Sequence, residues 1–337
     1  MTERRLPVYL LLDCSESMAG EAIEAVIAGV NTLIARLKTN PLAVETTYVS
    51  VITFAREARQ LVPLTEVSSF ELPKLSVRTG TSLGSVLKAL MQSIRQDVAS
   101  TSSIQKGDYR PLVFLLTDGQ PTDEWESIAK ELKRVKPRIA NIYAIGCGPD
   151  VDVAVLREVS DIVLLMKDLS PDSFHKLFIW LSASVQSVSA SPFGTNADDW
   201  PILPNPPYDV LEFPSQAEAR EPRPRQVFLH ARCIGTRRPY LMRFALNPAE
   251  GLYYAVAAHP LEMIEPGDSN LLPPINSASL RGCPSCPYCL NPMAALCPCG
   301  SLLCSPSNAE DLIVCPDCNS TLAYGSRTNF DIKRSQG

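Results

Sequence analysis

Long apolar runs are missing from this sequence, and so is any sign of a secretory leader. The 337 residues are 45% hydrophobic and 20% charged, which is ordinary for a soluble globular protein. No stretch approaches the roughly 20 apolar residues of a membrane-spanning helix. The arginines near the start precede an apolar run of only about seven residues, with no small-residue cleavage site. We therefore expect a cytoplasmic protein that contacts no membrane.

Basic charge, histidine and nucleotide-binding motifs are also scarce. The formal net charge is −5, which argues against non-specific binding to nucleic acid. Only three histidines occur, and none has an evident place as a general base. The phosphate-binding pattern Gly-x-x-x-x-Gly-Lys-Ser/Thr does not occur. These absences favour a binding protein over an enzyme.

A buried strand with a polar end is predicted near the start of the chain. Residues 8–12 are continuously apolar and lead into Asp13, which is followed by Ser15 and Ser17. Ligands bind at the carboxyl ends of strands in open α/β sheets. A carboxylate and two hydroxyls are hard oxygen donors, which suit Mg²⁺ better than zinc. A phosphatase with an aspartate nucleophile would need a carboxylate at position 15, where serine stands.

Two later segments carry similar polar groups. Residues 78–84 form a glycine-punctuated turn that contains Thr81 and opens a predicted helix. Residues 112–119 form a second apolar strand that ends in Asp118 and a glycine. Each segment alone is a weak signal, but their order and their positions at strand and helix boundaries make a specific set.

The three segments together resemble the von Willebrand factor A domain and its metal-ion-dependent adhesion site. The resemblance implies one bound Mg²⁺, with Mn²⁺ and Ca²⁺ left open, and a carboxylate of a partner protein as the last ligand. The residues that match the family's metal site are Asp13, Ser15, Ser17, Thr81 and Asp118.

The first 190 residues alternate between strand and helix patterns. This alternation predicts an α/β fold with a doubly wound, mostly parallel sheet, as in von Willebrand A and Rossmann-like domains. Helices are predicted over residues 22–37, 83–94, 124–135, 153–159 and 171–185, and strands over residues 8–12, 44–54, 58–64, 111–116, 139–146 and 162–166.

The composition changes after residue 190. Eight prolines lie between residues 192 and 224, so we predict a proline-rich linker over residues 191–224. A small β unit is predicted over residues 225–265, followed by a second joint. Residues 281–325 then form a predicted cysteine-rich domain that resembles a zinc ribbon. We thus expect three folded parts, the first of which spans residues 1–190.

Eight of the eleven cysteines lie in residues 283–318, in a pattern typical of structural zinc. Two Cys-Pro-x-Cys knuckles bracket this region, and thiolates select zinc. About 10–16 kcal/mol from zinc would be the main support of so small a domain. We predict two zinc ions, one held by Cys286, Cys289, Cys315 and Cys318 and the other by Cys283, Cys297, Cys299 and Cys304.

The pattern leaves some alternatives open for these cysteines. A crossed arrangement of ligand pairs is also compatible with the spacing, and His230 or His259 could replace Cys283. The three scattered cysteines are interpreted as thiols packed in the core. They are Cys14, Cys147 and Cys233.

The whole pattern resembles the TerY family of tellurium-resistance-associated proteins. Besides the cysteines, residues 178–185 (Phe-Ile-Trp-Leu-Ser-Ala-Ser-Val) and residues 238–244 (Arg-Pro-Tyr-Leu-Met-Arg-Phe) carry this resemblance. It implies a bacterial stress-response adaptor that acts with a Ser/Thr kinase and a PP2C-like phosphatase and is itself a possible phosphorylation target. Two other hypotheses remain, namely a zinc-ribbon regulator that binds nucleic acid through the arginines of residues 220–243, and a substrate adaptor of a AAA-type ATPase.

Overall fold

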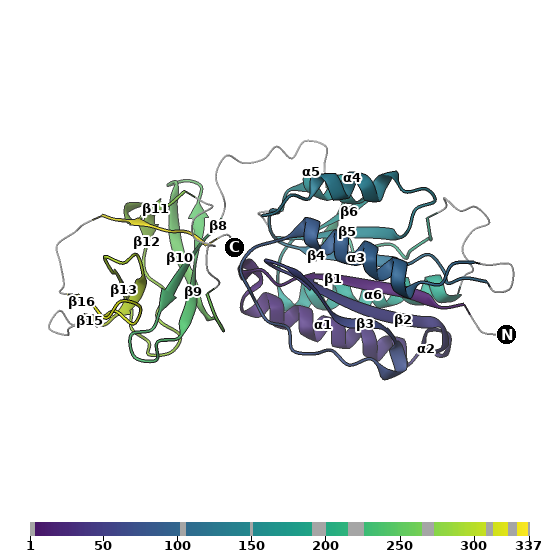
Figure 1. The fold of residues 1–337 in the computed structure, drawn as a ribbon, viewed down its shortest axis with the longest axis horizontal. Coiled ribbons are helices and arrows are strands. Elements are labelled where there is room, and N and C mark those ends of the chain that lie inside the picture. Colours follow the sequence, from purple (N-terminus) through teal and green to yellow (C-terminus); the bar gives the residue numbers. More distant parts are fainter. Residues whose placement is uncertain are drawn as a thin grey trace. The chain divides into compact units, whose positions relative to one another are not determined.

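The computed structural model of the chain divides into two compact units (Figure 1). It describes residues 4–101, 106–148, 151–190, 200–214, 226–264, 273–307, 313–322 and 329–335. The first unit contains Met1–Cys14, Gly20–Leu75 and Thr81–Arg220, and the second is built mainly from Glu221–Gly337. Each unit is described by itself.

The first unit is organised around a seven-stranded sheet with the strand order β3-β2-β1-β4-β5-β6-β7. The five central strands of this order, from β2 through β1, β4 and β5 to β6, run parallel to one another. The edge strands β3 and β7 are antiparallel to their neighbours. This arrangement confirms the predicted doubly wound, mostly parallel α/β fold. The strands are β1 (Leu6–Asp13), β2 (Thr47–Phe54), β3 (Ala58–Glu66), β4 (Leu112–Thr117), β5 (Asn141–Cys147), β6 (Ile162–Met166) and β7 (Leu211–Glu212).

Helices cover both faces of this sheet (Figure 1). Alternate residues of the central strands pack against α3, α4 and α5 on one face, and α1 packs against α6. A Cβ at Gly29 of α1 would lie 2.0 Å from the ring of Phe178 in α6, so glycine permits this close approach. The helices are α1 (Glu21–Lys38), α2 (Pro41–Thr46), α3 (Leu83–Asp97), α4 (Glu126–Arg134), α5 (Val153–Val159) and α6 (Pro171–Ala190).

Two details of the first unit differ from the sequence-based expectation. The strand expected over residues 44–54 begins only at Thr47, because Pro41 opens the short helix α2 and the Asn40 side chain caps it. The predicted linker over residues 191–224 contains β7, which pairs with β6 and so belongs to the first sheet. Residues 191–199 and 215–224 of that linker lie outside the described residues.

The second unit contains a six-stranded sheet with the order β12-β10-β9-β8-β14-β13. It joins strands from the predicted β unit and from the cysteine-rich region, so these two regions are not separate domains. The cause is the pairing of β14 with β8, which brings Leu303 opposite Arg232. The sheet strands are β8 (Gln226–Arg232), β9 (Pro239–Asn247), β10 (Leu252–Pro260), β12 (Leu280–Arg281), β13 (Met293–Leu296) and β14 (Leu302–Ser305).

Two short strand pairs complete the described part of the second unit. They are β11 (Ile275–Asn276) with β17 (Asp331–Ile332) and β15 (Ile313–Val314) with β16 (Thr321–Leu322). Residues 308–312 and 323–325 of the predicted cysteine-rich domain lie outside the described residues. Among the described helices, none is long and apolar enough to cross a membrane.

Candidate metal centres

Two of the predicted Mg²⁺ ligands lie at the carboxyl ends of neighbouring strands. β1 is buried along its whole length and ends at Asp13. The register pairs Leu12 with Leu116, which places Asp13 beside Thr117 at the end of β4. The Thr117 hydroxyl donates a hydrogen bond of 2.5 Å to the Asp13 carboxylate. Asp118 follows directly, so parallel pairing brings both carboxylates to one edge of the sheet.

Ser15 and Ser17 lie on the turn that leaves β1. Their hydroxyl oxygens are 2.8 Å apart. A short 3-10 helix, η1 (Glu16–Met18), is followed by Gly20, whose φ of 85° leads the chain into α1. Glycine adopts this conformation without steric cost. The turn is therefore short, and both hydroxyls follow Asp13 closely along the chain.

Thr81 approaches from the loop that precedes α3. Its backbone N–H donates to the Thr122 hydroxyl at 2.9 Å, and the Thr122 N–H donates to the Thr81 carbonyl at 3.0 Å. A Cβ at Gly119 would lie 3.0 Å from the Thr81 hydroxyl oxygen, so glycine leaves room beside this oxygen. Asp123 accepts hydrogen bonds from two backbone N–H groups in the first turn of α3. The loop after β4 thus holds the Thr81 loop in place.

This set of side chains fits a hard divalent cation. It combines carboxylates and hydroxyls, which are the ligands that Mg²⁺ and Ca²⁺ prefer. The exposed fractions of Asp13, Thr81 and Asp118 are 1%, 2% and 6%. The supporting roles of Thr117 and Thr122 were not predicted from the sequence, although Thr117 directly precedes the predicted ligand Asp118.

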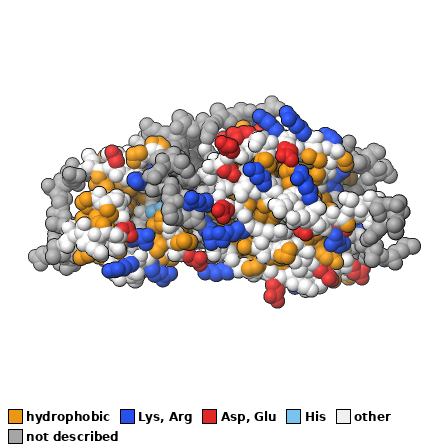
Figure 2. Space-filling view, in the orientation of Figure 1, with side chains coloured by type: hydrophobic (Ala, Val, Ile, Leu, Met, Phe, Trp, Pro, Cys, Tyr) orange, Lys and Arg blue, Asp and Glu red, His pale blue; other side chains and the backbone are white. Residues whose placement is uncertain are grey.

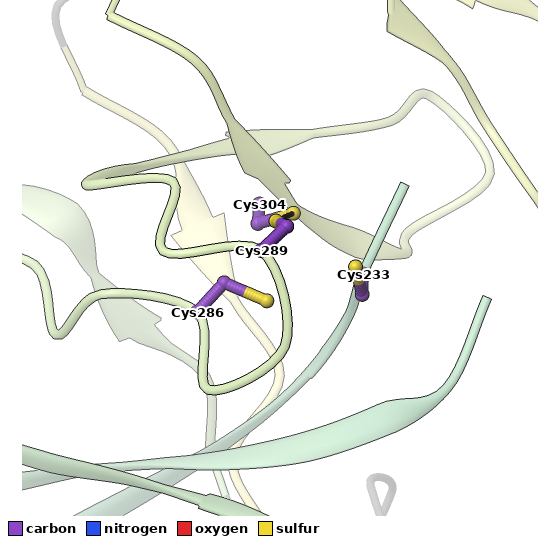
Figure 3. Close-up of side chains that lie close together, drawn as sticks. All are labelled: Cys233, Cys286, Cys289 and Cys304. Carbon is purple, nitrogen blue, oxygen red and sulfur yellow. Dashed lines mark hydrogen bonds between the residues drawn. The ribbon is translucent and has the colours of Figure 1, made fainter. Parts of the chain in front are cut away.

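Four cysteines of the second unit bring their sulfur atoms together (Figure 3). Cluster 1 consists of Cys233, Cys286, Cys289 and Cys304. Its sulfur atoms all lie within 4.8 Å of one another, and those of Cys289 and Cys304 are 3.5 Å apart. A tetrahedral zinc site with Zn–S distances of about 2.3 Å has sulfur atoms about 3.8 Å apart. Cluster 1 therefore has the size of a tetrahedral thiolate site.

Four other cysteines form a second group of similar size. Cluster 2 consists of Cys297, Cys299, Cys315 and Cys318. The sulfur atoms of Cys297 and Cys318 are 3.5 Å apart, and those of Cys299 and Cys315 are 3.7 Å apart. Cys299 and Cys318 are exposed, whereas three members of cluster 1 are buried. Cluster 2 is thus the more accessible of the two groups.

Cysteines of both clusters lie at the start of the same type of backbone turn. In the turn that begins at Cys286, the cysteine carbonyl accepts from the N–H four residues later, and its own N–H donates to the carbonyl five residues later. The turns that begin at Cys315 and Cys233 repeat both hydrogen bonds. The residue at the fourth following position has a positive φ in all three, namely Leu290, Asn319 and Arg237. A shorter version closes on Gly300 after Cys297.

The predicted grouping of the cysteines differs from the clusters in the structure. Cys286 and Cys289 group with Cys233 and Cys304 instead of with Cys315 and Cys318. Cys315 and Cys318 join Cys297 and Cys299, and Cys283 belongs to neither cluster. The reason is the parallel register of β8 and β14, which places the residue after Arg232 beside Cys304. Neither cluster includes a histidine. A cysteine ligand is usually recognised in sequence by a second cysteine two or three residues away. Cys233 has no such neighbour, so its local sequence gives no signal of metal binding.

Hydrogen bonds favour the thiolate form of some of these cysteines. Although burial raises it, hydrogen bonds from Thr236 lower the pKa of Cys233 to about 7. Hydrogen bonds from Ser320 lower the pKa of Cys318 to about 6. Thiolate is the form that ligates metals. Burial raises the pKa of the cluster cysteines Cys286, Cys297, Cys304 and Cys315. It likewise raises the pKa of Cys14 and Cys147, which are buried in the first unit as expected for core thiols.

Family models match both units. A model described as von Willebrand factor type A domain matches residues 8–167. A second model, described as TerY-C metal binding domain, matches residues 224–337. A comparison with curated proteins found no match.

Part of the chain is similar to solved structures. The ArnB paralog VWA2 from Sulfolobus acidocaldarius is 17% identical, with 55% of this chain and 46% of that chain covered and a TM-score of 0.40. The proximal thread matrix protein 1 of the mussel byssus, with a zinc-occupied MIDAS motif, is 20% identical, with 54% and 48% covered and a TM-score of 0.39. The von Willebrand factor type A protein from Catenulispora acidiphila is 17% identical, with 55% and 43% covered and a TM-score of 0.42. The chain spans less than half the length of these solved chains.

Proposed function

We propose that this chain, which has the TerY-like architecture of a von Willebrand factor type A domain followed by a TerY-C metal binding domain, is a metal-dependent protein-binding adaptor. The adaptor has no catalytic activity of its own. Its first domain docks a partner protein through a divalent cation, and its second domain is stabilised by metal ions in the cysteine clusters.

One observation supports the docking role most directly, namely the meeting of three separate polar segments at the carboxyl edge of the sheet. Thr117 orients the Asp13 carboxylate, and Thr122 ties the Thr81 loop to the loop that carries Asp118. Such preorganisation places oxygen donors where a cation can bind without ordering new loops.

The residues that would hold Mg²⁺ are Asp13, Ser15, Ser17, Thr81 and Asp118. Three of these five offer neutral hydroxyls, so only the two carboxylates offset the charge of the cation, and its open coordination position can still take an anionic oxygen. The group that fits is an Asp or Glu carboxylate of the partner, or a phosphate. A loop that places such a group at the open coordination position would bind in a Mg²⁺-dependent way.

The cysteine clusters would hold one zinc ion each. Sulfur-only ligation, tetrahedral dimensions and the absence of other ligand types within both clusters all favour zinc over Mg²⁺ or Ca²⁺. The role of the metal there is structural, because four thiolates leave no position open for a substrate.

The TerY resemblance suggests the partners, a Ser/Thr kinase and a PP2C-like phosphatase in a tellurium-resistance-associated stress response. A protein partner also suits the surface charge. In the view of Figure 2, the Lys and Arg side chains among the coloured residues are interspersed with Asp and Glu. Mixed charge on this face favours contacts with a protein over binding to the phosphate backbone of a nucleic acid.

The test is isothermal titration of the chain with the candidate kinase and phosphatase. The wild-type protein and Asp118→Ala are each titrated with and without Mg²⁺, in buffers with neither free zinc nor chelator, so that the cysteine clusters keep their metal and only the first domain is affected. Asp161→Ala, which removes an exposed carboxylate paired with Lys133, is the control. We expect binding only by wild type and the control, and only with Mg²⁺. Equal affinity in all combinations would exclude cation-mediated docking.

A further inference from the structure

Arg232, the last residue of β8, contacts parts of both cysteine clusters. It directly precedes Cys233 of cluster 1, and its Nη1 donates to the Arg237 carbonyl in the turn that begins at Cys233, at 3.4 Å. Its Nε lies 2.9 Å from Oδ1 of Asp317. Asp317 lies directly before Cys318 in the second knuckle of cluster 2. One guanidinium therefore contacts the turn of one cluster and the knuckle of the other.

The second oxygen of Asp317 extends this connection within cluster 2. The Ser301 hydroxyl donates to Oδ2 of Asp317 at 2.6 Å. Ser301 also closes the other knuckle, because its carbonyl accepts from the Cys297 N–H at 2.8 Å. The Asp317 carboxylate thus joins the two knuckles of cluster 2 and receives Arg232 on its other side.

Apolar packing runs beside this polar connection. Ile234, on the other side of Cys233, packs against the hydrophobic cores around both clusters. On the neighbouring strand, Leu303 is buried in the core around cluster 2, whereas Cys304 is a member of cluster 1. The two clusters therefore share a continuous set of packed residues, in which Cys233 and Cys304 are flanked by contacts to cluster 2.

We propose that Arg232 is a positioning residue that couples metal binding at the two clusters, an inference that rests on the proposed metal-binding role of both. Metal in cluster 2 holds the Cys315–Cys318 knuckle and thereby Asp317. The ion pair then orders Arg232 and the turn that presents Cys233, so cluster 1 loses less conformational freedom when it binds its own ion. By thermodynamic linkage, metal in cluster 1 favours cluster 2 by the same factor.

The size of the coupling follows from the exposure of the pair. The side chains of Arg232 and Asp317 are 30% and 37% exposed, so solvent and salt screen their attraction. We therefore expect a coupling near the low end of the usual range, about fivefold in affinity. The coupling should also decrease as the salt concentration rises.

The experiment is a zinc titration of the full chain in chelator-buffered zinc. Cys318→Ser leaves cluster 1 complete, and Cys289→Ser leaves cluster 2 complete. Without coupling, the wild-type curve equals the sum of the two single-cluster curves. We expect the overall association constant for both ions in the wild type to be about fivefold larger than the product of the two single-cluster constants. In the Arg232→Gln background, the sum should describe the titration.

Arg237→Gln is the matched control. It removes one arginine charge from the turn that follows Arg232, but it keeps the backbone groups of residue 237 that make the contacts above. It should retain the coupling. A second measurement changes no ligand, since Arg232→Gln in otherwise intact protein should release both zinc ions to a chelator several-fold faster than Arg237→Gln.

Two results would overturn the inference in distinguishable ways. If the wild type binds two zinc ions and the single-cluster curves add up in both backgrounds, the clusters bind metal but Arg232 does not couple them. If the wild type binds fewer than two ions, the proposed metal-binding role fails, and the coupling fails with it.

Discussion

At the scale of single residues, the sequence around Cys233 and its surroundings in the structure lead to different interpretations of its role. In sequence it is a solitary cysteine among arginines, which is typical of a packed thiol. In the structure its turn repeats the hydrogen bonds of the Cys286 and Cys315 turns, and its sulfur lies among three others. Cys283, which has better local spacing, lies outside both clusters.

The first prediction compares these two cysteines. Cys233→Ser should leave the purified protein with about one zinc ion fewer per chain, because cluster 1 loses a ligand. Cys283→Ser should retain the wild-type content. Elemental analysis of protein purified without chelator measures both. Loss of zinc from the Cys283 variant alone would show that the clusters are wrongly assigned.

The second prediction concerns Thr117. Thr117→Val keeps the shape of the side chain but removes the 2.5 Å hydrogen bond to the buried Asp13 carboxylate. We expect a loss of about 1–3 kcal/mol in the free energy of unfolding, together with weaker Mg²⁺ binding. Urea unfolding and magnesium titration measure these changes.

Thr65→Val is the control for Thr117, because it removes an exposed hydroxyl that bonds only locally, to the Pro63 carbonyl. It should change stability by less than about 0.5 kcal/mol. If both variants are equally stable, the hydrogen bond between Thr117 and Asp13 contributes little.

At the scale of elements, α3 depends on a side chain from another loop. Asp123 accepts hydrogen bonds from the N–H groups of Gly84 and Ser85 at 3.0 Å and 2.9 Å. Its negative charge also lies at the positive end of the helix dipole. The Ser82 side chain, at the position where a cap is usual, makes no capping hydrogen bond. The cap of α3 therefore comes from the loop that also holds Thr122.

The third prediction follows from this cap. Asp123→Ala should destabilise the first unit by about 1–2 kcal/mol and weaken Mg²⁺ binding, because the Thr81 loop precedes α3 directly. Asp123→Asn retains an acceptor oxygen and should have a smaller effect. The helical circular dichroism signal reports on this unit, since the described α-helices all lie in it. A normal Mg²⁺ affinity in Asp123→Ala would show that the helix cap does not position the site.

At the scale of the whole molecule, the two units differ in what stabilises them. The sheet of the first unit is enclosed by helices and a large apolar core. The second unit has a smaller core that includes the cysteines themselves, and the residues around cluster 2 form a small satellite core. We therefore expect loss of metal to destabilise the second unit but not the fold of the first.

The fourth prediction is the effect of chelation on each unit. Removal of zinc should make the β15–β16 region sensitive to protease, because few apolar contacts remain there to replace the metal. The helical circular dichroism signal should persist, and readdition of zinc should restore protection. Limited proteolysis with mass spectrometry locates the cleavage sites. A protease-resistant second unit in metal-free protein would contradict a structural role for zinc.

Features that depend on local pattern could be predicted from the order of the amino acids alone. Continuous apolar runs such as residues 8–12 predicted buried parallel strands, and 3.6-residue periodicity predicted α1 and α3, because one face of each is buried. The family resemblance and the order of the motifs predicted the von Willebrand factor type A domain followed by the cysteine-rich region. The five predicted Mg²⁺ ligands lie on the segments that the sequence singled out, and their role as ligands stays a prediction.

The packing of the folded chain selects which distant segments share a sheet and which cysteines share a cluster. The pairing of β7 with β6, of β14 with β8, and of Cys233 with Cys304 joins residues far apart in the chain. Spacing reports on contacts within a turn or a helix, whereas these pairings are selected by the packing of whole strands. A register change of one residue in β8 would turn Cys233 away from its cluster, and no local pattern specifies that register.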